Sequence, residues 1–258
     1  MRTATVSLFL ASLLLAAPVS AQQLPDPLRI ATEGAYAPFN YLDDQGKVQG
    51  FEIDLARAMC DEIGANCEFV VQDWDGIIPG LLAQKYDAII ASLYITDERR
   101  ERMAFSDKYY QVPARFIVPK SSSLEIGPEG MKGAVVGTQR ATSYERFMRD
   151  EMTGIDLRVY ATMEEAYLDL QSGRVDAIMA DVVAASEAFL KTSDGEAFEF
   201  RGPEYTGAEW FGYGAGVGVR KEETHIANAF SEAIAKVRAD GTYQKISDKW
   251  FGFDVYGE

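Results

Sequence analysis

Few side chains in this chain have the types and spacings that catalysis requires. The only histidine, His225, lies in the charged segment KEETHIAN (Lys221–Asn228), which is typical of the exposed start of a helix, so a Ser-His-Asp site would have to use it. The sequence contains no HExxH, P-loop or GxGxxG motif, and the glycine-rich GYGAGVG (Gly212–Gly218) leads into a strand rather than a helix. We therefore expect no catalytic residues, and binding is the favoured class of function.

The two cysteines, Cys60 and Cys67, could bind a metal or form a disulfide. They are seven residues apart, and one histidine supplies too few partners for a metal site. We expect no metal and no cofactor. In an oxidising compartment the pair favours a local disulfide between the end of a helix and the start of a strand, and the alternative is two buried free thiols.

The first residues have the pattern of an export signal. Arg2 is followed by an apolar run from Val6 to Ala16 and by the small residues Val19-Ser20-Ala21. We interpret residues 1–21 as a signal peptide, with the mature chain starting at Gln22, which places the protein in the periplasm. The alternative is an uncleaved anchor, but the run is short for one.

Charge and composition exclude further classes of protein. The chain has 258 residues, with 25 Lys+Arg against 40 Asp+Glu and a net charge of −15. A nucleic acid partner is not expected, because such binders need a basic face. Hydrophobic residues make up 47% of the chain, which excludes a disordered acidic tail. No later run is long enough for a membrane helix, so the mature protein is not expected to span a membrane.

Strand and helix patterns alternate along the chain, which predicts an α/β fold. The helix patterns have caps: Thr162 and Glu165 form a capping box, Gly173 ends the same helix, and Gly64 ends another. The predicted strands are Leu28–Thr32, Cys67–Val71, Asp87–Ala91, Ala134–Gly137, Leu157–Tyr160, Asp176–Ala180 and Ala215–Val219. The predicted helices are Asp54–Ile63, Asp75–Gln84, Thr142–Arg149, Met163–Gln171, Thr224–Ala239 and Thr242–Trp250.

An internal repeat indicates two lobes built on one plan. LLAQKYDAIIAS (Leu81–Ser92) resembles LDLQSGRVDAIMAD (Leu168–Asp181), and each contains Asp-Ala-Ile at the start of a short strand. Ser92 and Asp181 then follow equivalent strands at the edge where open α/β sheets bind ligands. We predict a first lobe of residues 22–111 and 213–258 and a second of 112–212, with hinge segments near 111–115 and 206–214.

Five collinear motifs carry a resemblance to a known family. They are EGAYAPFN (Glu33–Asn40), GFEIDLARAMC (Gly50–Cys60), DGIIPGLLAQKYDAIIASLYITDERR (Asp75–Arg100), ADVVAASEAFL (Ala180–Leu190) and RADGTYQKISDKWFGFDVYG (Arg238–Gly257). Together they resemble the periplasmic polar amino acid-binding proteins of ABC importers, above all the lysine/arginine/ornithine- and histidine-binding subgroup. The resemblance implies a two-lobed, type II Venus-flytrap fold, in which each lobe is a mixed, mostly parallel sheet flanked by helices. The Cys60–Cys67 spacing also fits the disulfide of that subgroup.

The resemblance implies how the two charged ends of an amino acid would be held. Arg99 matches the arginine that binds the α-carboxylate, which suits the planar fork of a guanidinium. Thr142 and Ser143 match second-lobe contacts to the same carboxylate, although capping of a helix is an equally good interpretation. Asp181 matches the partner of the α-ammonium, and Ser92 and the backbone of Leu93 match the same network.

The resemblance also implies how the ligand side chain would be selected. Tyr36 and Trp74 match two aromatic residues on either side of it, and Glu33 matches an acid at the far end of the pocket. Three positions depart from the pattern. Ala91 and Tyr94 stand where the family often has serine, and Ala141 stands where it has glycine, which costs about 1 kcal/mol if that position has a positive φ.

We expect a monomer that captures an amino acid with a cationic side chain (arginine, lysine or ornithine, with histidine or an opine as further options) and delivers it to an inner-membrane ABC permease. Two alternatives share the scaffold. One is a periplasmic dehydratase of the cyclohexadienyl type, and the other is a ligand-binding component of a signalling system.

Overall fold

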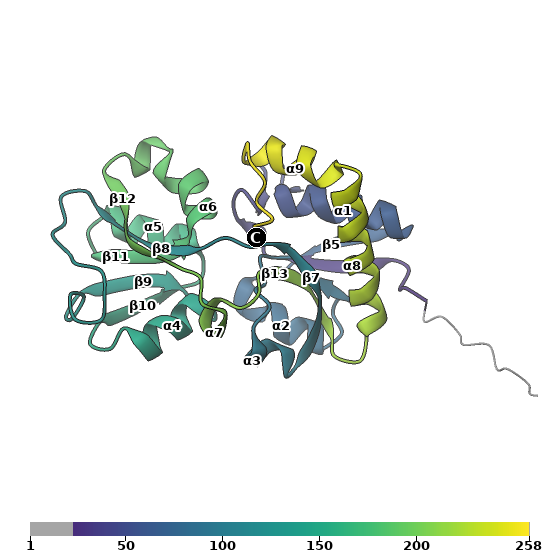
Figure 1. Ribbon diagram of the computed structural model, residues 1–258, viewed down its shortest axis with the longest axis horizontal. Helices are drawn as coiled ribbons and strands as arrows, with labels where there is room; N and C mark the ends of the chain where they lie inside the picture. The colour runs from purple at the N-terminus through teal and green to yellow at the C-terminus, as the bar shows by residue number, and fades with distance from the viewer. Residues whose placement is uncertain (1–22, 258) are drawn as a thin grey trace, which may run out of the picture.

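The computed structural model describes residues 23–257, and the predicted signal peptide lies outside them. Figure 1 shows two lobes side by side, each with its own five-stranded sheet and helices around it. A short three-stranded sheet, β2-β3-β4, accompanies the first lobe. Within residues 23–257 no helix is long and apolar enough to cross a bilayer.

The first sheet has the order β5-β1-β6-β13-β7 and combines strands from both ends of the chain. Strand β13 lies between β6 and β7 and is antiparallel to both, whereas β1 pairs in parallel with β5 and β6. The strands of this lobe are β1 (Leu28–Thr32), β2 (Ala35–Tyr36), β3 (Asn40–Leu42), β4 (Val48–Gln49), β5 (Cys67–Val71), β6 (Ala88–Ile89), β7 (Met103–Tyr110) and β13 (Ala215–Arg220). Its helices are α1 (Phe51–Ile63), α2 (Trp74–Leu82), α3 (Asp97–Arg100), α8 (Thr224–Ala239) and α9 (Thr242–Trp250).

The second sheet has the order β10-β9-β11-β8-β12 and uses only the middle of the chain. Its strands are β8 (Ala114–Pro119), β9 (Val135–Gln139), β10 (Asp156–Tyr160), β11 (Ala177–Asp181) and β12 (Phe198–Tyr205). The accompanying helices are α4 (Ser143–Glu151), α5 (Met163–Gln171) and α6 (Val182–Ala185), the turns η1 (Ser186–Leu190) and η2 (Ser193–Gly195), and α7 (Ala208–Phe211). The chain passes between the sheets from β7 to β8 and returns from β12 to β13.

The predicted α/β fold with mixed sheets is confirmed, although the sheets are less parallel than expected. In each sheet two neighbouring pairs are parallel and two are antiparallel. The antiparallel pairs involve β7, β8 and β12, which the sequence patterns did not indicate. These strands pair with segments far along the chain, so local periodicity carries little information about them.

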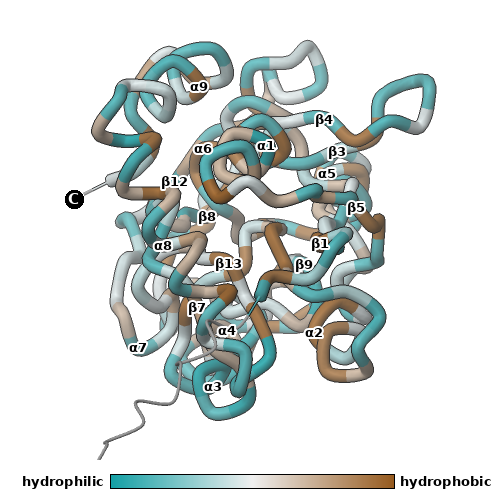
Figure 2. The backbone as a smooth tube through the Cα atoms, turned by 90° about the vertical axis from the view of Figure 1, so that its right-hand side faces the viewer, coloured by the Kyte–Doolittle hydropathy of each residue, from teal (hydrophilic) through white to brown (hydrophobic). Residues whose placement is uncertain are grey.

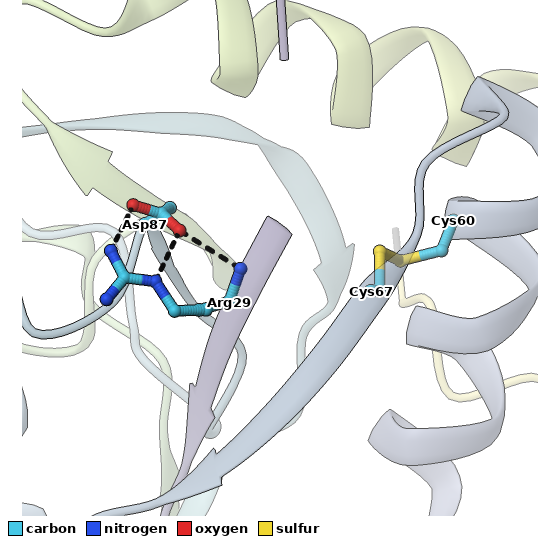
Figure 3. Close-up of a disulfide and its surroundings, with 4 residues drawn as sticks. All are labelled: Arg29, Cys60, Cys67 and Asp87. Carbon is cyan, nitrogen blue, oxygen red and sulfur yellow. Dashed lines mark hydrogen bonds and ion pairs between the residues drawn. A yellow bond between two sulfur atoms is a disulfide. The ribbon is translucent and has the colours of Figure 1, made fainter. Parts of the chain in front are cut away.

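The two copies of the internal repeat make the same contact, in which an aspartate before a strand binds a backbone amide of the neighbouring strand. In the first lobe, the Asp87 carboxylate accepts a hydrogen bond from the Arg29 amide at 3.0 Å, and in the second, Asp176 accepts one from the Val135 amide at 2.8 Å. Each aspartate thus fastens its strand to the neighbouring parallel strand. Figure 3 shows that Arg29 also binds Asp87 through its guanidinium, with Nη2 and Oδ1 3.0 Å apart.

The predicted disulfide joins Cys60 near the end of α1 to Cys67 at the start of β5. Gly64 lies between them in a left-handed conformation with φ of 64°, and it ends α1 as expected. The link fixes how the helix turns back into the edge strand of the sheet. It lies at the amino end of β5, away from the carboxyl end that leads to Trp74.

Apolar side chains fill the space between sheets and helices. Leu28, Ile30, Ala88 and Val219 on the first sheet are fully buried, as are Ile178 and Ala180 on the second. Figure 2 shows hydrophobic stretches along the inner strands and mostly hydrophilic outer turns. The carboxyl ends of β1, β5, β6, β9 and β11 are thereby held near the junction of the lobes.

Candidate functional site

A small cavity of about 20 Å³ lies between the lobes, at the carboxyl ends of strands from both sheets. Its walls contain nine of the residues that the sequence singled out together with two that it did not. They are Glu33, Tyr36, Trp74, Ala91, Ser92, Tyr94, Arg99, Thr142 and Ser143, and the additional Gln139 and Tyr144. A hollow of about 420 Å³ adjoins it and shares Trp74, Arg99, Thr142 and Ser143, so it leads from the cavity to the rim of the cleft.

Arg99 on α3 presents a guanidinium without a carboxylate partner. Its Nη1 donates to the Tyr94 carbonyl at 2.8 Å, and its Cζ lies 5.6 Å from the centre of the Trp74 ring. Within residues 23–257 no Asp or Glu lies within ion-pair distance of it. Burial lowers the pKa of Arg99 to about 10, which still leaves it charged at neutral pH. The group is therefore poised to accept an external anion.

The start of α4 faces the same cavity from the second lobe. Thr142 caps the helix, because its Oγ1 accepts a hydrogen bond from the Glu145 amide at 3.2 Å. Ser143 is buried and begins the helix, and first-turn amides have no acceptor within their own helix. Capping and anion binding are thus compatible here, since the side chain of Thr142 performs the first and free amides can perform the second.

The loop before α4 contains the expected backbone strain. Ala141 has a φ of 57°, a left-handed conformation that glycine tolerates better. Its amide donates to Glu145 Oε2 at 2.6 Å, so the capping residues also hold this turn.

Asp181 ends β11, does not line the cavity, and lies directly behind Tyr94. Its Oδ1 accepts hydrogen bonds from the Val183 and Ala184 amides at 2.8 and 3.0 Å, so it caps α6. The Tyr94 hydroxyl lies 3.4 Å from Oδ2 and donates to the Val112 carbonyl at 3.1 Å. Burial raises the pKa of Asp181 to about 7. A cation beside this carboxyl group would favour its ionised form.

Ser92 and Leu93 lie in a turn that a buried acid holds. Ser92 has a φ of 52°, and its amide donates to Glu52 Oε1 at 2.6 Å. The Ser92 hydroxyl is enclosed and makes no hydrogen bond of good geometry within the described chain, although burial raises the pKa of Glu52 and the approach of this hydroxyl partly offsets that rise. The Leu93 side chain is buried and does not line the cavity, and its carbonyl accepts a hydrogen bond from the Gly216 amide at 3.1 Å; the part predicted for its backbone stays a prediction.

Glu33 follows β1 in the wall of the cavity and accepts a hydrogen bond from the second lobe. Its Oε1 accepts a hydrogen bond of 2.6 Å from Gln139 Nε2, at the end of β9. Burial raises the pKa of Glu33 to about 7, and the bond from Gln139 only partly offsets this. No cation among residues 23–257 pairs with it.

Aromatic rings make up much of the remaining wall. Tyr36 and Trp74 are 7% and 8% exposed, and the Trp74 Nε1 has no hydrogen-bond partner among the described residues. Tyr94 and Tyr144 are also buried, and they narrow the cavity. As it stands, the space holds about one water molecule, so an amino acid requires the lobes or these side chains to move apart.

Gln139, Tyr144 and Glu52 were not predicted as site residues. A glutamine in a strand and a tyrosine in a helix have no spacing that marks them, and only their position across from the first lobe gives them a role. Glu52 is fully buried within α1, and an acid at a core position of an amphipathic helix is a detectable exception. Within residues 23–257 no cluster of three or more His, Cys, Asp or Glu could hold a metal ion.

Two lobes with similar sheets, and a cavity lined by charged, polar and aromatic side chains where their strand ends face each other, are the features of a two-lobed binding protein. The family comparison agrees: residues 28–253 match the bacterial extracellular solute-binding proteins, family 3, and the chain belongs to that family.

Relatives with names and structures cover nearly the whole chain. The L-arginine-binding protein of Pseudomonas aeruginosa is 42% identical over 90% of both chains, and the histidine-binding periplasmic protein of Escherichia coli K12 is 42% identical over 91% of both. A solved structure of an ancestral arginine-binding protein bound to arginine is 33% identical, with a TM-score of 0.82 over 89% of this chain and 100% of that one.

Proposed function

We propose that this protein captures an amino acid with a cationic side chain between its lobes and delivers it to an ABC permease. The observation that carries the proposal is the guanidinium of Arg99, which faces the cavity without an anionic partner. This half-buried guanidinium makes one hydrogen bond, to the Tyr94 carbonyl, so it keeps donors for the two parallel hydrogen bonds that a carboxylate can accept.

The rest of the cavity supports a ligand with charges at both ends. The α-carboxylate binds Arg99 and the first-turn amides of α4. The α-ammonium binds the Ser92 hydroxyl and Asp181, which Tyr94 must uncover. The cationic side chain lies along Tyr36 and Trp74 and reaches Glu33. The names of the relatives, which include arginine-, histidine- and lysine/arginine/ornithine-binding proteins, support this ligand class.

Hinge closure and export complete the proposal. The predicted signal peptide directs the chain to the periplasm, where the Cys60–Cys67 disulfide forms. Ligand enters the open cleft, the lobes close about segments 111–115 and 206–214, and the permease binds the closed form. The mature protein acts as a monomer.

Calorimetric titration of the exported protein with the common amino acids and with opines tests the ligand class. We expect heat with arginine, lysine or ornithine and none with leucine or glutamate. Arg99→Ala should abolish binding of every amino acid, whereas Arg100→Ala, on the same short helix but exposed, should leave it unchanged. Binding by Arg99→Ala as tight as by the unchanged protein would contradict the proposal.

Two further experiments separate the alternatives. Incubation with prephenate or arogenate would release product only if the protein were a dehydratase, and we expect none. Uptake of the bound amino acid should fall in a strain that lacks this protein. Unchanged uptake together with tight binding would instead favour a signalling component.

A further inference from the structure

Gln139 is the residue through which the second lobe reaches the predicted side-chain end of the cavity. It ends β9, is 3% exposed, and lines the cavity across from Glu33. Its Nε2 donates to Glu33 Oε1 at 2.6 Å and to the Ala161 carbonyl at 3.0 Å. Both partners are acceptors, so the orientation of the amide is fixed and both of its hydrogens are used.

This orientation leaves two oxygen atoms without donors. Gln139 Oε1 and Glu33 Oε2 receive no hydrogen bond from any residue in 23–257, and neither is a fully enclosed atom. One belongs to the second lobe and the other to the first. This end of the cavity therefore presents one unpaired acceptor oxygen from each wall.

We propose that Gln139 is a specificity-determining residue that makes the site select a guanidinium over a simple ammonium. The inference rests on the proposed function, since it assumes a cationic amino acid in this cavity. A guanidinium is planar and carries five N–H donors on three edges, so it bonds Glu33 and Gln139 at the same time. The aromatic walls of Tyr36 and Trp74 also suit a flat cation.

An ammonium uses the same end of the cavity differently. It is a compact, strongly hydrated charge, and the Glu33 carboxylate together with water satisfies it. Gln139 therefore contributes more to the affinity for arginine than to the affinity for lysine. Glu33 thus selects for a positively charged side chain, and Gln139 selects for a planar one.

The test compares arginine and lysine affinity in Gln139→Leu and in Gln139→Asn, which keeps the amide but shortens it. We expect arginine binding to weaken about tenfold or more in both variants, as for loss of a hydrogen bond to a charged group, and lysine binding to change less than about threefold. Gln171→Leu, a glutamine of the same lobe on α5 outside the cavity, is the matched control and should change neither. Circular dichroism and melting curves establish that each variant is folded.

The outcomes distinguish this inference from the proposed function. If the unchanged protein binds arginine and the ratio of arginine to lysine affinity stays within about threefold in both Gln139 variants, the role of Gln139 is wrong while the proposed function stands. If the unchanged protein binds neither ligand, both are wrong. A fall in the ratio in both variants, with Gln171→Leu unaffected, supports the inference.

Discussion

At the scale of single residues, the charge of the cavity depends on two buried carboxyl groups. Burial raises the pKa of Glu33 and of Asp181 to about 7 in each case, and neither has a cationic partner within the described chain. Near neutral pH each group therefore carries a proton part of the time. A cationic ligand binds the ionised forms, so its binding must release those protons.

We therefore expect arginine affinity to rise with pH. Below pH 7 each carboxyl group must lose its proton before the cationic ligand can bind, whereas above pH 7 it is already ionised. Lowering the pH from 8 to 6 should therefore weaken arginine binding by about tenfold for each group. Calorimetry in buffers of different ionisation enthalpy measures the proton release directly. Glu33→Gln should remove one group's share of the pH dependence, and an unchanged pH profile in this variant would contradict the assignment.

Backbone strain at Ala141 gives a second prediction at this scale. A φ of 57° destabilises the folded state with alanine by about 1–2 kcal/mol. Glycine removes this strain, but its greater freedom in the unfolded chain offsets about 0.5–1 kcal/mol of the gain. The net gain is about 0–1.5 kcal/mol, so Ala141→Gly should raise the melting temperature by up to about 6 °C. The control is Ala83→Gly, at an exposed helix end with a φ of −84°, which should not stabilise the protein. A lower melting temperature for Ala141→Gly would show that the turn is not strained.

The sequence pointed to site residues where they lie in motifs that resemble those of a known family. Arg99 and Glu33 were predicted through the family resemblance, in which a charged residue has a defined part, and Ser92 also follows a recognisable repeat. Gln139 could not be found this way, because its role comes from a contact with Glu33, 106 residues earlier in the chain. Tyr94 was noted as bulky, but its position in front of Asp181 depends on how the two lobes meet.

At the scale of elements, caps and periodicity located the helices well. Met163–Gln171, Thr224–Ala239 and Thr242–Trp250 were predicted at the bounds that the structure has. The strands β7, β8 and β12 were missed, since MAFSDKYY (Met103–Tyr110) has no strict alternation and is ordered by pairing with β13. Local patterns thus define elements that are stable by their own caps and buried faces, and long-range pairing defines the rest.

The disulfide gives the prediction for this scale. It closes a loop of only a few residues, so Cys60→Ser with Cys67→Ser should cost about 2–3 kcal/mol of unfolding free energy. Arginine affinity should stay within about threefold, because the link lies at the amino end of β5 and the cavity follows its carboxyl end. Chemical denaturation and calorimetry measure the two effects. A large loss of affinity without a loss of stability would mean that the link positions Trp74.

At the scale of the whole molecule, the lobes already touch through polar contacts. Glu33 bonds Gln139, Tyr94 approaches Asp181, and Arg140 Nε lies 2.7 Å from Asp75 Oδ2 at the exposed rim. A cavity of about 20 Å³ cannot admit an amino acid in this arrangement. Ligand entry therefore requires the cleft to open.

A cross-link over the rim tests this requirement. Asp75→Cys and Arg140→Cys place two thiols on opposite lobes, and a short bis-maleimide should join them in the closed form. We expect the cross-linked protein to show no arginine binding by calorimetry, while the same double variant without the reagent binds. Equal binding by both would show that the ligand enters without separation of the lobes.

The position of β13 has a consequence for how the protein is made. This strand lies between β6 and β7 but follows all of the second sheet in the chain, so the first sheet stays divided until its last strand appears. A chain that is synthesised amino end first can complete the second lobe from β8 to β12 before the first sheet has all of its strands. The second lobe should thus fold before the first sheet is complete. A nascent chain stopped before Ala215 should expose the unpaired edge of β6 to chaperones.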